Sequence, residues 1–144
     1  MVAGEVEAGT VNNHQLAFYD IMPTFCDLAG IENYVDRYTN KSLKVDYFDG
    51  LSFAPTLLGE GKQEAHEFLY WEFHETNMMA LRMGDWKLVV QNGTCYLYDL
   101  VSDTHEDNNL ASKYPEIVKE MKAILKREHT ASSRSEFNNI TLPN

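Results

Sequence analysis

Cysteine and long apolar runs are both scarce in this sequence. Cys26 and Cys95 are its two cysteines, so at most one internal disulfide can form, and a pair this far apart is as often two buried thiols. No apolar run approaches the roughly 20 residues that cross a membrane. The opening stretch MVAGEVEAGT has neither a basic start nor an apolar core, so it does not resemble an export signal. These absences exclude a framework of several disulfides and a membrane-spanning helix.

Basic residues are also few. Twelve Lys and Arg stand against 22 Asp and Glu, which gives a net charge of -10 and a pI near 4.8. This charge repels nucleic acids, heparin-like polymers and anionic membranes at long range, so any anion would need a local basic pocket. The hydrophobic content of 44%, with 12% aromatics, is enough for the core of one domain.

Several catalytic signatures are missing. The sequence has no G-x-S-x-G nucleophile motif, and its five histidines form no H-x-x-x-H or H-E-x-x-H pair for zinc. The acidic run Ser102–Asn109 lacks the glycine and glutamate spacing of an EF-hand, which favours a solvated capping loop over a calcium site. His74 and Glu75 could form half of an acid-base site, but a polar bend between two strands is the simpler interpretation.

One group of residues could contact an anion. Arg82 and Lys87 lie close to Trp86, and a guanidinium and an ammonium near an aromatic face can hold a sulfated or carboxylated sugar. The alternative is that Trp86 anchors the core of a sheet while Arg82 and Lys87 pair with carboxylates. The excess of acidic residues favours this alternative.

The segment 18–30 predicts a short helix. Asp20 can cap it, Pro23 falls in the first turn where its missing N–H costs nothing, and Gly30 can end it. Apolar side chains nearly encircle this helix, as is typical of a helix that protein covers on more than one side. They are Phe18, Ile21, Met22, Phe25, Leu28 and Ala29.

The middle of the chain predicts a connector and then a sheet. Residues 32–66 have no hydrophobic period and contain turn-forming Gly and Pro, so they predict a connector loop. Strand-like runs follow, separated by the pairs Gly84-Asp85 and Asn92-Gly93. This pattern predicts an antiparallel meander of about four strands.

The segment 114–129 predicts the longest helix. Pro115 opens it, acidic residues come early and basic residues late, and an apolar stripe at helical spacing predicts that it covers one face of the sheet. After Thr130 few apolar anchors remain, which predicts an extended or mobile tail.

The order of these segments resembles the carboxy-terminal part of the type I sulfatases, the formylglycine-dependent arylsulfatase family of the alkaline phosphatase superfamily. The resemblance runs over residues 8–128 through the stretches AGTVNNHQLAFYDIMPTFCDLAGI, DGLSFAPTLLGEG, LYWEF, ALRMGDWKLV and LYDLVSDTHEDNNLA. It implies an α+β fold in which an antiparallel sheet of about four strands packs against the C-terminal helix. The helix before the sheet would belong to an α/β catalytic domain. The implied divisions are the end of that domain at 1–31, a connector loop at 32–66, the sulfatase carboxy-terminal subdomain at 67–130 and a flexible tail at 131–144.

The catalytic apparatus of that family does not match anything in this sequence. In the family, a Cys or Ser in a C/S-x-P/A-x-R motif becomes formylglycine, and Asp and Asn side chains hold a divalent metal, calcium. Here Cys26 opens CDLAG and Cys95 opens CYLYD, so neither fits. The resemblance therefore implies a fragment that is inactive alone, with no catalytic or metal-binding residues, whose partner is the N-terminal catalytic domain of the same protein. Periplasmic or secreted placement follows from the family alone.

Some matching residues carry an expected role. Asp20, Pro23 and Thr24 match a helix motif of the family and are expected to be structural. In the family, the smaller subdomain borders the active-site cleft and its loops touch the non-sulfated part of the substrate, so the bend 74–77 is the expected substrate-facing segment. The candidate substrate-binding residues are His74, Glu75, Asn77, Arg82 and Lys87.

Two functions fit this sequence. In the first, a parent enzyme hydrolyses sulfate esters of sugars or aryl alcohols, while this part completes the fold and borders the substrate cleft. The alternative is a non-catalytic carbohydrate-binding or assembly module with the same fold. Another hydrolase of the superfamily, such as a phosphodiesterase, is less favoured because the segments follow the sulfatase order. Phe18, Ile21 and Phe25 are expected to lack cover, which predicts a homodimer or disorder near the first helix.

Overall fold

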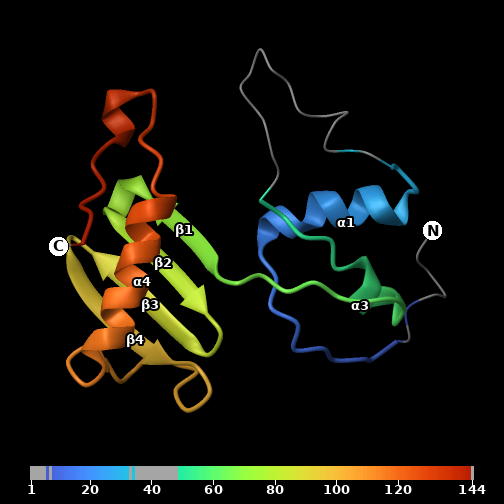
Figure 1. The fold of residues 1–144 in the computed structure, drawn as a ribbon, viewed down its shortest axis with the longest axis horizontal. Coiled ribbons are helices and arrows are strands. Elements are labelled where there is room, and N and C mark those ends of the chain that lie inside the picture. The colour runs from blue at the N-terminus through green and yellow to red at the C-terminus, as the bar shows by residue number, and fades with distance from the viewer. Residues whose placement is uncertain (1–5, 7, 33, 35–48, 144) are drawn as a thin grey trace. The chain divides into compact units, whose positions relative to one another are not determined.

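The computed structural model describes residues 6, 8–32, 34 and 49–143 (Figure 1). The chain divides into two compact units, Met1–His66 and Glu67–Asn144. Part of the predicted connector, residues 35–48, lies outside the described residues. Within the described ranges, no helix has the length and the apolar content that crossing a membrane requires.

The first unit, where it is described, is built on short helices. A 3-10 turn, η1 (Phe18–Asp20), runs directly into α1 (Ile21–Leu28), and α3 (Ala54–Leu58) follows later in the chain. As predicted, Pro23 lies in the first turn of α1. Gly30 follows the helix with a φ of 66°, the left-handed conformation in which glycine commonly ends helices.

The predicted cap of this helix was wrong. The side chain of Asp20 makes no capping hydrogen bond to α1. It turns back instead and accepts the backbone N–H of Ala17 at 2.7 Å, which closes η1. Asp20 does lie at the start of α1, but its side chain closes the 3-10 turn η1 that precedes the helix.

Helix α3 was missed inside the segment interpreted as a connector. Pro55 lies in its first turn, and Gly59 ends it in the left-handed conformation with a φ of 68°. Both residues were attributed to loop turns, because a helix of one and a half turns is too short to show a hydrophobic period. Ala54 at its start is buried, which fixes this short helix within the first unit.

The second unit begins with a four-stranded antiparallel sheet, which confirms the predicted meander. The strands pair in chain order, and they are β1 (Leu69–Phe73), β2 (Met78–Met83), β3 (Trp86–Gln91) and β4 (Thr94–Asp99). Asn92 and Gly93 both have a positive φ, as the two-residue turn of a tight hairpin requires. The hairpin signal in the sequence therefore located the last turn correctly.

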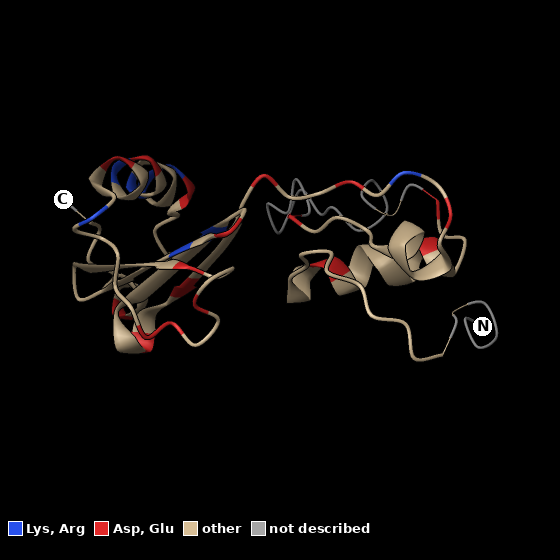
Figure 2. Cartoon of the chain, turned by 90° about the horizontal axis from the view of Figure 1, so that it is seen from below, with Lys and Arg blue, Asp and Glu red and all other residues tan. Residues whose placement is uncertain are grey.

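The core of this unit lies between one face of the sheet and helix α4 (Pro115–Glu128). Leu81, Leu88 and Leu97 are paired across three neighbouring strands, and each is fully buried. Met121 and Leu125 of α4 are buried on the same cluster, and Figure 2 shows the helix lying on one face of the sheet. Burying each such side chain stabilises the fold by about 1.5–3 kcal/mol, so this layer holds the unit together.

The residues after Thr130 return to the sheet unit. They form the 3-10 turn η3 (Ser135–Phe137), after which Ile140 packs against the core and Pro143 is fully buried. The end of the chain is thus folded back rather than extended, while the predicted mobility of residues 131–144 stays a prediction.

Candidate functional site

The bend between β1 and β2 is the first part of the candidate site. The 3-10 turn η2 (His74–Thr76) follows β1, and Asn77 then adopts the left-handed conformation with a φ of 51°. Its backbone N–H donates to the carbonyl of His74 at 3.1 Å, which closes the turn. Asparagine tolerates this conformation better than most residues, so the local sequence itself favours the bend. Glu75 at the middle of the bend is exposed.

The ring of His74 is held by aromatic neighbours. Its centroid lies 4.4 Å from that of Phe137 in the tail and 6.4 Å from that of Phe73 at the end of β1. Phe73 is 51% exposed and Phe137 is 38% exposed, so these rings lie at the surface. Such contacts orient the imidazole without ionic pairing, which favours a contact surface over an acid-base pair with Glu75.

The side chain of Asn77 connects three segments. Its Oδ1 accepts the backbone N–H of Thr141 at 2.6 Å, and its Nδ2 donates to Thr141 Oγ1 at 2.8 Å and to Asn92 Oδ1 at 3.1 Å. Both donor hydrogens of the amide therefore have partners. The bend, the β3–β4 turn and the tail are fixed to one another through this residue.

Arg82 and Lys87 form the second part of the candidate site. They are paired across β2 and β3, at the end of the strands away from the bend. Arg82 is five residues further along the chain than Asn77, which corresponds to about 16 Å along an extended strand. The structure therefore divides the five candidate residues into two groups and does not bring them together.

The surroundings of this basic pair favour the structural alternative in part. Lys87 Nζ lies 2.5 Å from Glu106 Oε1, so this ammonium is paired with a carboxylate. The Trp86 ring packs at 5.1 Å from the ring of Tyr114 and contacts the core. Arg82 Nε donates a long hydrogen bond of 3.5 Å to the carbonyl of Gly84. The partner in this bond is a neutral carbonyl and not a carboxylate.

A buried carboxylate organises the first unit. Asp20 is 1% exposed, and its Oδ1 accepts the backbone N–H of Leu51 at 2.8 Å and lies 2.8 Å from His66 Nε2. Thr24 adds a second link, because its hydroxyl donates to the carbonyl of Asp20 at 2.6 Å and accepts the N–H of Phe53 at 2.9 Å. The Asp and Thr of the helix motif therefore hold residues 51–53 against α1, a structural role.

A second network closes the sheet unit. His129 Nδ1, just after α4, lies 2.6 Å from Glu72 Oε1 on β1. The Tyr70 hydroxyl donates to the same carboxylate oxygen. Burial, followed by this bond to Glu72, raises the pKa of Tyr70 far above its usual range. The three residues connect the end of α4 to β1, and sequence reasoning missed them because 57 residues separate His129 from Glu72.

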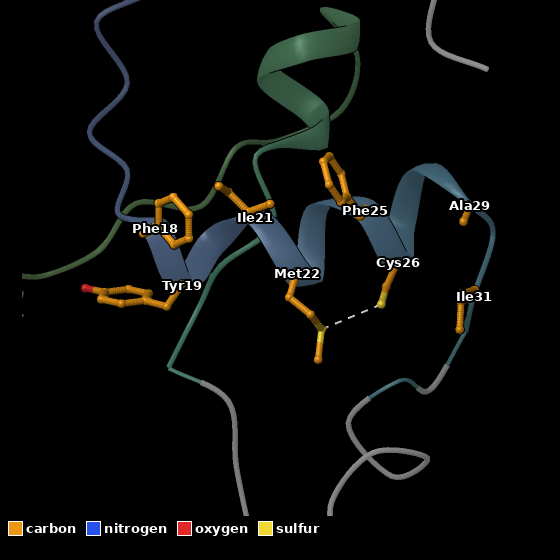
Figure 3. A pocket seen from close by; sticks show the side chains of 8 residues that line it. All are labelled: Phe18, Tyr19, Ile21, Met22, Phe25, Cys26, Ala29 and Ile31. Atoms are coloured by element: carbon orange, nitrogen blue, oxygen red, sulfur yellow. Dashed lines mark hydrogen bonds between the residues drawn. The ribbon is translucent and has the colours of Figure 1, made fainter.

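One side of α1 forms an open apolar groove. Figure 3 shows the side chains that line this groove of about 620 Å³, which are Phe18, Tyr19, Ile21, Met22, Phe25, Cys26, Ala29 and Ile31. Phe18 is 87% exposed and Phe25 is 65% exposed. Large aromatic side chains this exposed in one patch mark an interaction surface.

The acidic loop and the cysteines have structural explanations. Both carboxylate oxygens of Asp103 accept backbone N–H groups, from Asp107 at 3.1 Å and Asn108 at 2.8 Å, and these bonds, led by the one from Asn108, lower the pKa of Asp103. The described residues hold no group of three or more His, Cys, Asp or Glu side chains that could bind a metal ion. Cys26 and Cys95 are both free thiols.

Comparisons with known proteins relate the chain to sulfatases. No family model matches the sequence. The chain is 29% identical over 131 residues to the Delta 4,5-hexuronate-2-O-sulfatase of Bacteroides thetaiotaomicron, which covers 84% of this chain and 25% of that protein. A solved structure of a 2-O GAG sulfatase superposes with a TM-score of 0.57 at 26% identity, over 86% of this chain and 29% of that one. The chain is homologous to the carboxy-terminal region of sulfatases.

The sulfatase homology confirms the resemblance and the fold class. The phosphonate monoester hydrolase of Agrobacterium radiobacter shares the fold, with a TM-score of 0.52 at 24% identity over 77% of this chain and 25% of that one. The chain spans about a quarter of the length of the curated sulfatase that it matches. The matched region covers both units of this chain, whereas the roles of His74, Glu75, Asn77, Arg82 and Lys87 stay predictions.

Proposed function

We propose that this chain is the carboxy-terminal part of an enzyme that hydrolyses sulfate esters of saccharides. The observation that carries the proposal is the homology to a hexuronate-2-O-sulfatase over 84% of the chain. In this proposal the reacting groups belong to the catalytic domain and not to this chain. Its role is to complete the enzyme's fold and to form one border of the substrate cleft.

The apolar groove on α1 is the proposed contact with the catalytic domain. Phe18 of η1 and Phe25 of α1 are both largely exposed, and a patch of exposed large apolar side chains is typical of an interaction surface. The matched sulfatase is about four times as long as the region shared with this chain, so a catalytic domain of that kind is the occupant that we propose. Burial of these rings would then stabilise the joined protein.

The bend His74–Asn77 is the proposed contact with the saccharide. Glu75 is exposed, and the imidazole of His74 lies beside the exposed ring of Phe73, so polar and stacking groups occur together, as sugar rings require. Arg82 and Lys87 would form a separate contact for an anionic group further along the substrate.

The proposal places formylglycine and calcium in the catalytic domain. Among the described residues no group of three or more His, Cys, Asp or Glu side chains could hold a metal ion, and the proposal assigns no chemical step to this chain. Placement in the periplasm or outside the cell is part of the same proposal and rests on the sulfatase relationship.

The first test is to read the gene upstream of the codon for Met1 in the same frame. The proposal expects a C/S-x-P/A-x-R motif and acidic metal ligands there, and expects the encoded protein to release sulfate from a sulfated disaccharide while the 144-residue chain alone does not. A nearby stop codon, or an encoded protein that leaves sulfated saccharides unchanged, would end the hydrolase proposal. Binding without hydrolysis would then favour the carbohydrate-binding module.

The bend is tested in the active protein by His74→Ala. Loss of a substrate contact should raise KM several-fold with a smaller change in kcat. His105→Ala is the matched control, since His105 is exposed in the acidic loop and is outside both candidate groups. Equal kinetics for the two variants would remove His74 from the proposed contact surface.

A further inference from the structure

The segment Ser132–Asn138 forms a loop that is held together by its own hydrogen bonds. The backbone N–H of Ser132 donates to Asn138 Oδ1 at 2.7 Å, and Asn138 Nδ2 donates to the Ser132 carbonyl at 2.8 Å. The N–H of Arg134 donates to Ser132 Oγ at 3.1 Å, and η3 fills the middle of the loop. The loop therefore has a defined shape that does not depend on the sheet.

Both ends of this loop are fixed to the sheet unit. Before it, His129 pairs with Glu72 of β1. After it, Ile140 packs against the core, and Thr141 makes two hydrogen bonds to Asn77. A preformed loop between two fixed ends can move as a body, because its own bonds persist while the ends act as hinges.

The loop lies over the bend through one aromatic contact. The Phe137 ring sits 4.4 Å from the ring of His74, at an interplanar angle of 49°. Within the loop, the Arg134 guanidinium lies 5.8 Å from the centre of the Phe137 ring. Phe137 is 38% exposed in this contact, whereas the anchors on either side are hydrogen-bonded or packed against the core.

We propose that Ser132–Asn138 is a lid that shields His74 in the free protein and opens to admit a saccharide to the bend. This inference rests on the proposed function of the bend. The Phe137 ring lies against the imidazole that a sugar ring would contact, so lid and ligand compete for His74. The hydrogen bonds of Asn77 to Thr141 keep the hinge in place, and the lid opens without release of the tail's end.

A test that needs no ligand measures the accessibility of His74. The 144-residue protein is treated with diethyl pyrocarbonate at neutral pH, and peptide mass spectrometry follows the modification of each histidine. We expect Phe137→Ala to speed modification of His74 several-fold and to leave exposed His105 unchanged. Phe137→Tyr, which keeps the ring, should retain the slow rate, and Phe18→Ala in the first unit is the matched control. If diethyl pyrocarbonate modifies His74 at equal rates in wild type and Phe137→Ala, the lid proposal is overturned.

The competition is tested with a sulfated, hexuronate-containing disaccharide titrated into the same proteins. We expect Phe137→Ala to bind several-fold more tightly than wild type, because the competitor is gone. Weaker or unchanged binding would overturn the proposal, since Phe137 would then be part of the contact surface or irrelevant to it. If His74→Ala binds the disaccharide as tightly as wild type, or if no variant binds it, the proposed function of the bend fails. Control of saccharide access by the lid then fails as well. The modification rates still decide whether Phe137 shields His74.

Discussion

The two units of this chain are held together in different ways. The sheet unit buries a continuous apolar layer between its strands and α4, with Leu81, Leu88 and Leu97 fully inaccessible. The helical unit depends on hydrogen bonds to the carboxylate of Asp20 and leaves the aromatic ring of Phe18 largely in water. Apolar burial is the larger and less specific source of stability, so the sheet unit should fold by itself and the helical unit should need a partner.

The largest expected effect is on the core of the sheet unit. Leu88→Ala removes a side chain that is fully buried and should lower the free energy of unfolding by about 2–5 kcal/mol, because lost burial and a cavity add together. Both tryptophans, Trp71 and Trp86, lie in this unit, so their fluorescence during urea unfolding reports it alone. Val101→Ala, at a residue that is 71% exposed, is the control. If Leu88→Ala lowers the free energy of unfolding by less than Val101→Ala does, α4 does not cover the apolar face of the sheet as the structure shows.

The next effect concerns the buried carboxylate of the helical unit. Asp20→Ala leaves the N–H groups of buried Ala17 and half-buried Leu51 without their acceptor, and a fully buried donor left unpaired costs about 1–3 kcal/mol. Amide exchange at these two positions should become much faster while the sheet unit keeps its protection. Asp27→Ala, an exposed acid on the same helix, provides the comparison. Unchanged exchange at Leu51 would contradict the assigned role of Asp20.

A smaller effect is expected on association. The isolated chain should form dimers through the apolar groove of α1, and replacing both Phe18 and Phe25 by serine should shift it toward monomer in light scattering. Val101→Ser in the sheet unit should leave the mass unchanged, since that residue is exposed outside the groove. A wild-type monomer whose α1 amides exchange slowly would show that the helical unit is stable without a partner.

Local patterns in the sequence were sufficient for the sheet unit. The pair Asn92-Gly93 has the left-handed preference that a tight hairpin needs, and it located the β3–β4 turn. The apolar spacing of residues 114–129 predicted a stripe that covers the sheet, and Met121 and Leu125 of α4 are buried there. In both cases the signal and the structure lie within one element, which is why the prediction succeeded.

Contacts between distant residues were beyond the same reasoning. Two partners of the Asp20 side chain, Leu51 and His66, are 31 and 46 residues away in the sequence. The residues next to Asp20 suggested only that it caps the helix. The bend was recognised as polar, but its contact with Phe137 was not, because one aromatic residue in a polar tail gives no periodic signal. Long-range pairing therefore decides what the candidate site can do.

The smallest predicted effect depends on pH and concerns the network that closes the sheet unit. Burial and the bond to Glu72 raise the pKa of Tyr70 above its unfolded value of 10.0. The folded state therefore favours the neutral phenol, and this stability is fully present below pH 10.0 and is lost as the pH rises toward the raised folded pKa. Tyr70→Phe should flatten the decline of unfolding free energy above about pH 10 in urea titrations followed by tryptophan fluorescence. Tyr96 lies on the opposite face of the sheet, so the unfolding free energy of Tyr96→Phe should decline with pH as that of wild type does. If the unfolding free energies of all three proteins decline in parallel, folding does not protect the Tyr70 hydroxyl from ionisation.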